Sequence, residues 1–195
     1  MHIFRTAQSL IDHLNEQRSK GLTIGFVPTM GALHSGHLAL INHASHENNV
    51  VVASIFVNPT QFNNAEDLKR YPRNIEDDIQ KLETTNCQIL FNPEVEEMYT
   101  EKVESLEINL GGLDTVMEGA HRPGHFDGVA TIVSRFFSIV DPDKAYFGEK
   151  DYQQLQIIRH VSKQMGFKVN IVPHPIERNE QGLALSSRNQ LLPMK

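Results

Sequence analysis

The sequence predicts an α/β protein built on a doubly wound parallel sheet. Five short apolar segments, which begin near residues 23, 50, 88, 144 and 169, alternate with segments of helical periodicity. Residues 50–57 form a nearly continuous β-branched and apolar run, which is typical of a strand buried on both faces of a parallel sheet. Right-handed crossovers then place the helices on both faces. Neither an internal repeat nor a linker-like change of composition divides the chain.

The composition limits the class of protein. The 195 residues are 39% hydrophobic and 22% charged, and the formal net charge of −6 disfavours a non-specific grip on nucleic acid or an anionic membrane. Cys87 is the only cysteine, which excludes a disulfide within the chain and fits a reducing compartment. Charged and polar residues interrupt the N-terminal stretch, which resembles neither a signal peptide nor a spanning helix. We expect a cytoplasmic protein without nucleic-acid or membrane partners.

The first helix is expected over residues 6–19. Thr6 is a suitable N-cap, and Gly21 is a suitable stop. The helix is predicted by apolar residues at helical spacing, namely Ala7, Leu10, Ile11 and Leu14. We expect this helix to pack on the sheet without a chemical role.

The stretch at residues 23–40, TIGFVPTMGALHSGHLAL, predicts a strand, a tight loop and the start of a helix that ends near residue 46. Its glycines let backbone N–H groups approach an anion, and the following helix N-terminus favours negative charge. His34 and His37 are three residues apart, so both can donate hydrogen bonds to that anion. The pattern predicts a phosphate site. A structural metal site on the histidines and an ordinary strand-to-helix turn stay open as alternatives.

The strand at residues 50–57 is followed by a polar loop that contains Asn58 and Gln61. Next comes a stretch, residues 67–73, that brings together Lys69, Arg70, Tyr71 and Arg73. Ligands of open α/β sheets bind beyond the carboxyl ends of the strands, so both loops are expected to place polar groups at one edge. A solvated loop is the alternative.

The middle of the chain predicts three elements: an amphipathic helix with an acidic face at residues 75–82, a strand at 88–91, and an exposed or edge strand at 105–110. A short helix is then expected to end near Gly119. Arg122 and His125 follow in a rigid basic loop, immediately before an apolar helix at residues 129–140. A guanidinium donates hydrogen bonds in pairs, so Arg122 is a candidate ligand of phosphate or carboxylate, with a surface turn as the alternative.

A second strand, glycine and helix start occurs at residues 144–151. The strand at residues 144–148 leads into Glu149, Lys150 and Asp151 at the beginning of a helix that ends near residue 164. Lys150 can meet phosphate there as a mobile point charge. The alternative is an ordinary lysine at a helix end, although that position favours acidic residues.

After a last strand at residues 169–172, two serines precede an arginine. Ser186, Ser187 and Arg188 offer hydroxyl and guanidinium groups that can hold anionic oxygens. The alternative for this segment is a helix cap.

Several motifs between residues 21 and 189 resemble those of known families. His34-Ser35-Gly36-His37 is similar to the HxGH signature of the nucleotidyltransferase superfamily, which includes class I aminoacyl-tRNA synthetases and small-molecule adenylyltransferases. The chain as a whole resembles the pantothenate synthetase (pantoate–β-alanine ligase) family through FVPTMGALHSGH, SIFVNPTQF, RYPRN, EGAHRPGHFDGVATIVSRFF, YFGEKDYQQL and GLALSSRN.

The resemblance implies a Rossmann-like fold of the adenine nucleotide α-hydrolase-like type. It also implies ATP-dependent condensation of pantoate with β-alanine to pantothenate, in coenzyme A biosynthesis. Pantoate and ATP first form pantoyl adenylate and pyrophosphate, and β-alanine then displaces AMP. The resemblance further implies Mg²⁺ with the ATP and a homodimer. No His, Asp and Glu cluster of recognisable metal spacing accompanies the single cysteine, so we expect no resident metal site.

The resemblance also implies roles for residues of this sequence. The groups expected to act in catalysis are His34, His37, Lys150 and Arg188, with His37 as the proton donor. The residues expected to bind ATP are Met30, Gly31, Ala32, Leu33, His34, Ser35, Gly36, His37, Gly148, Glu149, Lys150, Asp151, Glu177, Leu185, Ser186, Ser187 and Arg188. The residues expected to bind pantoate are Gln61, which is also near β-alanine, and Gln154, with Asn58, Tyr71, Arg122 and His125 as further contributors.

The sequence departs from the family pattern after SSRN, where members continue into a C-terminal lid domain. The expected division is a nucleotide- and pantoate-binding domain at residues 1–189 and the truncated start of the C-terminal region at 190–195. Such a chain is expected to keep its binding residues and to form pantothenate poorly. Two alternatives are a non-catalytic nucleotide-binding fragment and a different adenylyltransferase on the same scaffold.

Overall fold

The computed structural model describes residues 1–99 and 102–191 of the chain. Its centre is a six-stranded sheet in the order β1-β4-β3-β2-β5-β6, and the neighbouring strands are parallel. The strands are β1 (His2–Phe4), β2 (Ile24–Thr29), β3 (Val50–Ile55), β4 (Ile89–Phe91), β5 (Lys144–Gly148) and β6 (Asn170–His174). The predicted parallel α/β sheet is confirmed.

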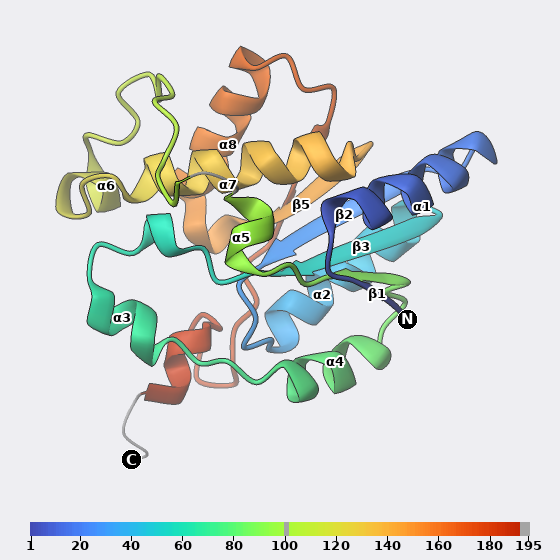
Figure 1. Cartoon of the computed structure of the whole chain (residues 1–195). Coiled ribbons are helices and arrows are strands. Elements are labelled where there is room, and N and C mark those ends of the chain that lie inside the picture. Colours follow the sequence, from blue (N-terminus) through green and yellow to red (C-terminus); the bar gives the residue numbers. More distant parts are fainter. Residues whose placement is uncertain (100–101, 192–195) are drawn as a thin grey trace.

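Helices cover both faces of the sheet (Figure 1). One face carries α1 (Ala7–Ser19), α7 (His125–Val140) and α8 (Tyr152–Gln164), and the other carries α2 (Ser35–Glu47) and α4 (Ile75–Glu83). The side chains of β3 alternate between these layers. Val50 and Val52 pack with α1, α7 and α8, whereas Val51 and Ala53 pack with α2 and α4. This double burial explains the continuous apolar run in the sequence.

Shorter elements connect the layers. They are η1 (Pro59–Gln61), α3 (Ala65–Arg70), α5 (Val95–Met98), α6 (Met117–His121), η2 (Glu149–Asp151) and η3 (Ser187–Leu191). Within the described ranges, no helix has the length and apolar character needed to cross a membrane. Residues 192–195, which belong to the expected start of a C-terminal region, lie outside the described part of the chain.

The edges of the sheet differ from the prediction. Residues 105–110 form no strand, and the edge strands of the sheet are β1 and β6. The backbone N–H of Leu106 instead donates to Thr131 Oγ1 of α7 at 2.8 Å. β1 was not expected, since a three-residue strand is too short to show an alternating pattern.

One helix and two helix boundaries also differ from the prediction. The stretch after η1, expected as a loop, contains α3, whose first turn is capped by Asn64 Oδ1. α6 continues to His121 instead of ending near Gly119. α7 begins at His125 rather than near residue 129, directly after Gly124, whose φ of +77° turns the chain into the helix.

The strand order reverses at β2, which lies between β3 and β5. β3 and β4 extend the sheet to one side of β2, and β5 and β6 extend it to the other. The loops after β2 and β5 therefore leave the same edge of the sheet next to each other. Ligands of open α/β sheets bind at such a switch point, where the strand order reverses, so a binding site is expected at these two loops.

Candidate active site

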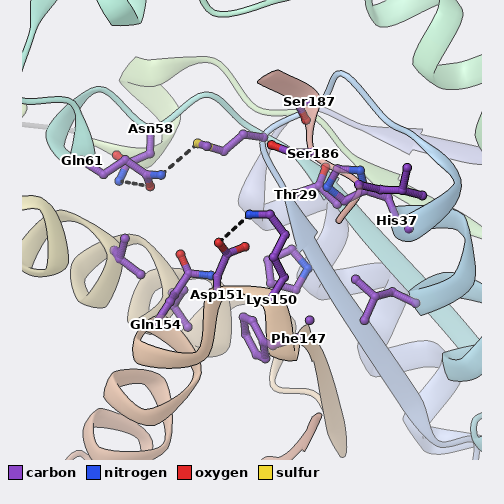
Figure 2. A pocket seen from close by; sticks show the side chains of 18 of the residues that line it. Thr29, His37, Asn58, Gln61, Phe147, Lys150, Asp151, Gln154, Ser186 and Ser187 are labelled. Atoms are coloured by element: carbon purple, nitrogen blue, oxygen red, sulfur yellow. Dashed lines mark hydrogen bonds and ion pairs between the residues drawn. The ribbon is translucent and has the colours of Figure 1, made fainter. Parts of the chain in front are cut away.

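A pocket of about 480 Å³ lies at the switch point (Figure 2). Its wall is built from the segments that follow β2, β3, β5 and β6, together with α6 and α7. Most of the predicted site residues line it. They are Met30, His34, Gly36, His37, Asn58, Gln61, Tyr71, Arg122, His125, Gly148, Lys150, Asp151, Gln154, Glu177, Leu185, Ser186, Ser187 and Arg188.

The remaining predicted residues do not line the pocket; they are Gly31, Ala32, Leu33, Ser35 and Glu149. Ser35 and Glu149 are exposed elsewhere on the surface. Ala32 and Leu33 were expected to bind ATP, but their backbone N–H groups donate to the carboxylate of Asp78. Contacts of these residues with ATP stay predictions.

His34 and His37 lie at the start of α2. His34 is the N-cap residue, and its Nδ1 accepts a hydrogen bond from the Gly36 N–H at 3.2 Å. His37 Nδ1 accepts from the His34 N–H at 3.3 Å. An accepting nitrogen of a neutral imidazole carries no proton, so each neutral ring has its proton on Nε2. Since both rings line the pocket with centroids 4.1 Å apart, the local backbone prepares two Nε2–H donors.

The surroundings hold both rings in the neutral form. Burial is the largest cause that lowers the pKa of His34, and the charges of Lys150 and Lys81 lower it further. Burial, the neighbouring His34 and the two lysines lower the pKa of His37 to about 3. Across the described ranges, no group of three or more His, Cys, Asp and Glu side chains is placed to hold a metal. With both Nδ1 atoms engaged by the backbone, the rings suit hydrogen-bond donation to phosphate better than a structural metal.

Lys150 and Asp151 lie in η2, directly before α8, and Asp151 is the N-cap of that helix (Figure 2). Lys150 Nζ donates to Asp151 Oδ1 at 2.9 Å. Both side chains are partly exposed, so this pair contributes little to stability. A lysine near a helix N-terminus also opposes the positive end of the helix dipole, which an anion bound at Lys150 would offset.

Asn58 and Gln61 lie toward the other side of Lys150 from His37, Ser186 and Ser187 (Figure 2). Asn58 Nδ2 donates to Gln61 Oε1 at 3.1 Å and to the Gly128 carbonyl at 3.0 Å. These bonds orient the Gln61 amide so that Nε2 points toward Met30 Sδ, 2.9 Å away. The Gln61 side chain therefore presents a donor to the pocket.

Gly128 explains why η1 and α7 can meet so closely. A Cβ atom at this position would lie only 2.5 Å from the Thr60 carbonyl oxygen. The glycine lets α7 contact the backbone of η1, which carries Gln61. No local pattern indicated this role, because the contact joins segments far apart in the chain.

Arg122 and His125 form a connected group beside Gln61. The Arg122 guanidinium pairs with Glu118 and lies 3.1 Å from His125 Nε2. His125 Nδ1 donates to the Gln61 carbonyl at 2.8 Å. Burial lowers the pKa of His125, which keeps the ring neutral. An incoming carboxylate or phosphate would have to compete with Glu118 for Arg122.

Residues 185–188 close the pocket between the loop after β2 and α3. Ser187 Oγ donates to the Ala32 carbonyl at 3.1 Å, and Arg188 pairs with Asp67 at 3.0 Å. The Arg188 guanidinium lies 5.8 Å from the centroid of the Tyr71 ring. Ser186 Oγ accepts from the Arg188 N–H at 3.3 Å, so the helix-cap interpretation applies to Ser186. An anion in the pocket would compete with Asp67 for the Arg188 guanidinium.

Two pocket residues that the sequence interpretation missed are Thr29 and His174. Each is the last residue of a strand, β2 and β6 respectively. Their position at strand ends could have indicated these two residues in the sequence, because ligands of parallel sheets bind beyond the strand ends. Thr29 Oγ1 donates to the Ser54 carbonyl, and His174 Nδ1 lies 3.1 Å from His43 Nδ1.

Comparison with known proteins identifies a family. The family model described as "Pantoate-beta-alanine ligase" matches residues 2–195. A pantothenate synthetase from Christiangramia forsetii is 51% identical over 193 residues, which cover 98% of this chain and 68% of that protein. A second pantothenate synthetase, from Bacteroides thetaiotaomicron, is 52% identical over 192 residues, which cover 98% of this chain and 68% of that protein. The chain spans about two thirds of the length of these curated relatives.

Two solved structures share the fold over nearly the whole chain. Pantothenate synthetase from Thermus thermophilus is 49% identical, with a TM-score of 0.91 over 99% of this chain and 68% of that one. Pantoate-beta-alanine ligase from Francisella tularensis, complexed with beta-gamma ATP and beta-alanine, is 42% identical, with a TM-score of 0.94 over 99% and 74%. These similarities confirm the Rossmann-like fold that the sequence predicts.

Proposed function

The chain belongs to the pantoate-beta-alanine ligase family, and we propose that it carries the part of this ATP-dependent enzyme that binds ATP and pantoate and forms pantoyl adenylate. Family membership confirms the predicted resemblance and favours this ligase over a different adenylyltransferase on the same scaffold. Because the chain spans about two thirds of its relatives, its own activity in the complete condensation is part of the proposal.

The observation that supports the proposal is that one pocket contains two kinds of binding group, which lie on different sides of Lys150. Nε2–H donors of two neutral histidines and the ammonium of Lys150 suit the phosphates of ATP. On the other side of Lys150, Gln61 and Gln154 offer amide groups of the kind that bind a small hydroxy acid. Both kinds of group face the same space, as an attack of one substrate on the other requires.

In the proposed first step, a carboxylate oxygen of pantoate attacks the α-phosphorus of ATP. The bond between the α-phosphorus and the bridging oxygen breaks, and pyrophosphate leaves with the electron pair. The protein aligns the two reactants and stabilises the charge that develops on the leaving group, which is the work of His34, His37, Lys150 and, once released from Asp67, Arg188. Mg²⁺ enters this proposal as part of the MgATP substrate.

In the second step, the amine of β-alanine attacks the acyl carbon of pantoyl adenylate. The bond to the AMP oxygen breaks, an amide forms, and the amine loses its proton. The Francisella tularensis relative, solved with an ATP analogue and β-alanine together, supports a site that holds both. Asn58, Tyr71, Arg122 and His125 line the same pocket as Gln61 and are proposed to shape the place of the acid and the amine.

Pantoate-dependent exchange of labelled pyrophosphate into ATP tests the proposal directly. We expect exchange with MgATP and pantoate together and none when pantoate is left out. β-Alanine is then added, and pantothenate is measured by mass spectrometry. Exchange shows that the chain forms the adenylate, whatever the rate of the second step. ATP binding in calorimetry without any exchange would instead support the alternative of a non-catalytic nucleotide-binding fragment.

The homodimer and the cytoplasmic location also belong to the proposal. Val103, Leu106 and Val116, in the segment before α6, are 51%, 43% and 51% exposed, and we propose that they contribute to the dimer contact. We expect sedimentation to give twice the 22.1 kDa mass of the chain, and Leu106→Asp to return the protein to the mass of a single chain. A wild-type protein that stays at 22.1 kDa at all concentrations contradicts the dimer. The cytoplasmic location is supported by Cys87, which is buried and free.

A further inference from the structure

Asp78 is a buried carboxylate for which the proposed chemistry has no use. It lies on α4, its relative exposure is 2%, and it is not among the residues that line the pocket. Its Oδ2 accepts a hydrogen bond from the Ala32 N–H at 2.9 Å, and its Oδ1 accepts from the Leu33 N–H at 2.7 Å. Both oxygens of a side chain from α4 are therefore engaged by two successive N–H groups of the loop after β2.

The backbone of this loop has an unusual form. Gly31 has a φ of +78°, and Ala32 has a φ of +50°, a conformation that residues with a Cβ rarely adopt. Such turns point successive N–H groups to one side and form an anion-binding concavity. Here the anion is the internal carboxylate of Asp78. A strained turn of this kind persists only where its surroundings fix it.

Other contacts hold the carbonyl groups of the same turn. Lys81 Nζ donates to the Leu33 carbonyl at 2.8 Å, and Ser187 Oγ donates to the Ala32 carbonyl at 3.1 Å. His34 follows directly as the N-cap of α2, with its N–H on His37 Nδ1. The turn that Asp78 holds therefore directly precedes the start of α2, which carries the two histidines.

We propose that Asp78 is a positioning residue that acts as an internal anion, fixing the turn at Gly31–Leu33 so that His34 and His37 present their Nε2–H groups to the triphosphate. This inference rests on the proposed function for the identity of the ligand. It assigns Asp78 no contact with substrate. The carboxylate acts through the loop, and its loss misplaces donors that lie on α2.

Asp78→Asn is the decisive variant, because a carboxamide has the same shape but only one accepting oxygen. Its NH2 group must face one of the two N–H groups, and the turn can no longer keep both bonds. Misplacement of a catalytic group by about 1 Å costs up to about 100-fold. We expect the dissociation constant of MgATP to rise by about 10-fold to 100-fold and the rate of pyrophosphate exchange to fall, with the KM for pantoate unchanged.

Two control variants separate positioning from general destabilisation. Glu76→Gln removes an exposed carboxylate from the same first turn of α4. Leu82→Val weakens the core on the same helix, since Leu82 is fully buried. We expect both controls to bind MgATP like the wild type. If Leu82→Val lowers the melting temperature as much as Asp78→Asn and also weakens MgATP binding equally, Asp78 is merely structural and the proposal is overturned.

A second readout needs no ATP. The ¹⁵N resonances of the imidazoles report which ring nitrogen carries the proton, and amide exchange reports the Ala32 and Leu33 N–H groups. In Asp78→Asn, we expect faster exchange of these amides and loss of the fixed Nε2–H form of His37, neither of which occurs in the controls. Unchanged resonances and amide protection overturn the inference even if the wild type binds ATP. If the wild type binds no ATP, the proposed function fails, and the resonances alone decide whether Asp78 positions the histidines.

Discussion

Pantoate-dependent pyrophosphate exchange by the His37→Ala variant is expected to fall by about 100-fold to 1000-fold. Removing one preorganised donor to a developing negative charge has an effect of this size in enzymes where it has been tested. His37 lines the pocket, and its ring carries the proton on Nε2, because Nδ1 accepts from the His34 N–H. The substitution deletes the donor and also the group that holds the backbone of the neighbouring His34.

The control for this variant is His46→Ala, on the same helix. His46 is exposed in the last turn of α2 and does not line the pocket. We expect this variant to exchange pyrophosphate at the wild-type rate. Exchange is measured at saturating pantoate with MgATP varied, so that the loss of rate is separated from the loss of affinity. A His37→Ala variant with wild-type exchange would remove His37 from the list of groups that stabilise pyrophosphate.

The same substitution is expected to make the fold less sensitive to acid. The pKa of His37 is lowered from 6.5 to about 3 by burial and by the nearby positive groups. Between these values the unfolded chain binds more protons than the native protein, so the native state loses stability as the pH falls from about 6.5 toward 3. Urea unfolding of His37→Ala should therefore depend less steeply on pH in this window than that of the wild type. An equal slope for both proteins contradicts the pKa shift.

The groups around His34 and His37 therefore disfavour positive charge in the pocket until an anion binds. Burial and the charges of Lys150 and Lys81 disfavour the protonated form of both imidazoles, and Lys150 itself lies in η2, directly before α8. A bound triphosphate supplies negative charge next to the same groups and so offsets the repulsion between their positive charges. Binding energy is then available where the leaving group forms, which is the place where catalysis requires it.

The parts of this architecture that could be predicted are those with a local signal. The continuous apolar run of β3 reflects burial on both faces, and the glycines and histidines after β2 mark a turn into a helix. The doubly wound arrangement follows from the alternation of strands and helices with right-handed crossovers. Resemblance to the family then supplied the residue roles, and the structure gathers most of those residues into one pocket.

The parts that could not be predicted depend on contacts between distant segments. The first turn of α4 contains Glu76, Asp77 and Asp78, which look alike in the sequence as a solvated acidic face. Of these three, Asp78 alone is buried, because the rotation of α4 against the loop after β2 decides which acid meets the N–H groups. Residues 105–110 alternate like an edge strand, but the backbone N–H of Leu106 bonds to Thr131 of α7 and not to a strand.

Gln61→Glu is expected to raise the KM for pantoate by about 100-fold or more. The Gln61 side chain is 8% exposed, and Asn58 Nδ2 fixes its Oε1, so the opposite atom of the amide faces the pocket next to Met30 Sδ. A glutamate keeps the bond from Asn58 but places a negative oxygen where Nε2 stood. That oxygen repels the carboxylate of pantoate and can donate no hydrogen bond, and a like-charge contact in a buried site costs several kcal/mol.

Gln164→Glu introduces the same charge at the exposed C-terminus of α8 and serves as the matched control. We expect this variant to leave the KM for pantoate and the KM for MgATP unchanged. In Gln61→Glu, the dissociation constant of MgATP should change much less than the KM for pantoate, because Gln61 lies toward the other side of Lys150 from His37 (Figure 2). Equal losses for the two substrates would mean that the substitution acts on the whole pocket. A selective loss of pantoate places the acid against the amide that Asn58 orients, within reach of the α-phosphorus held beside Lys150.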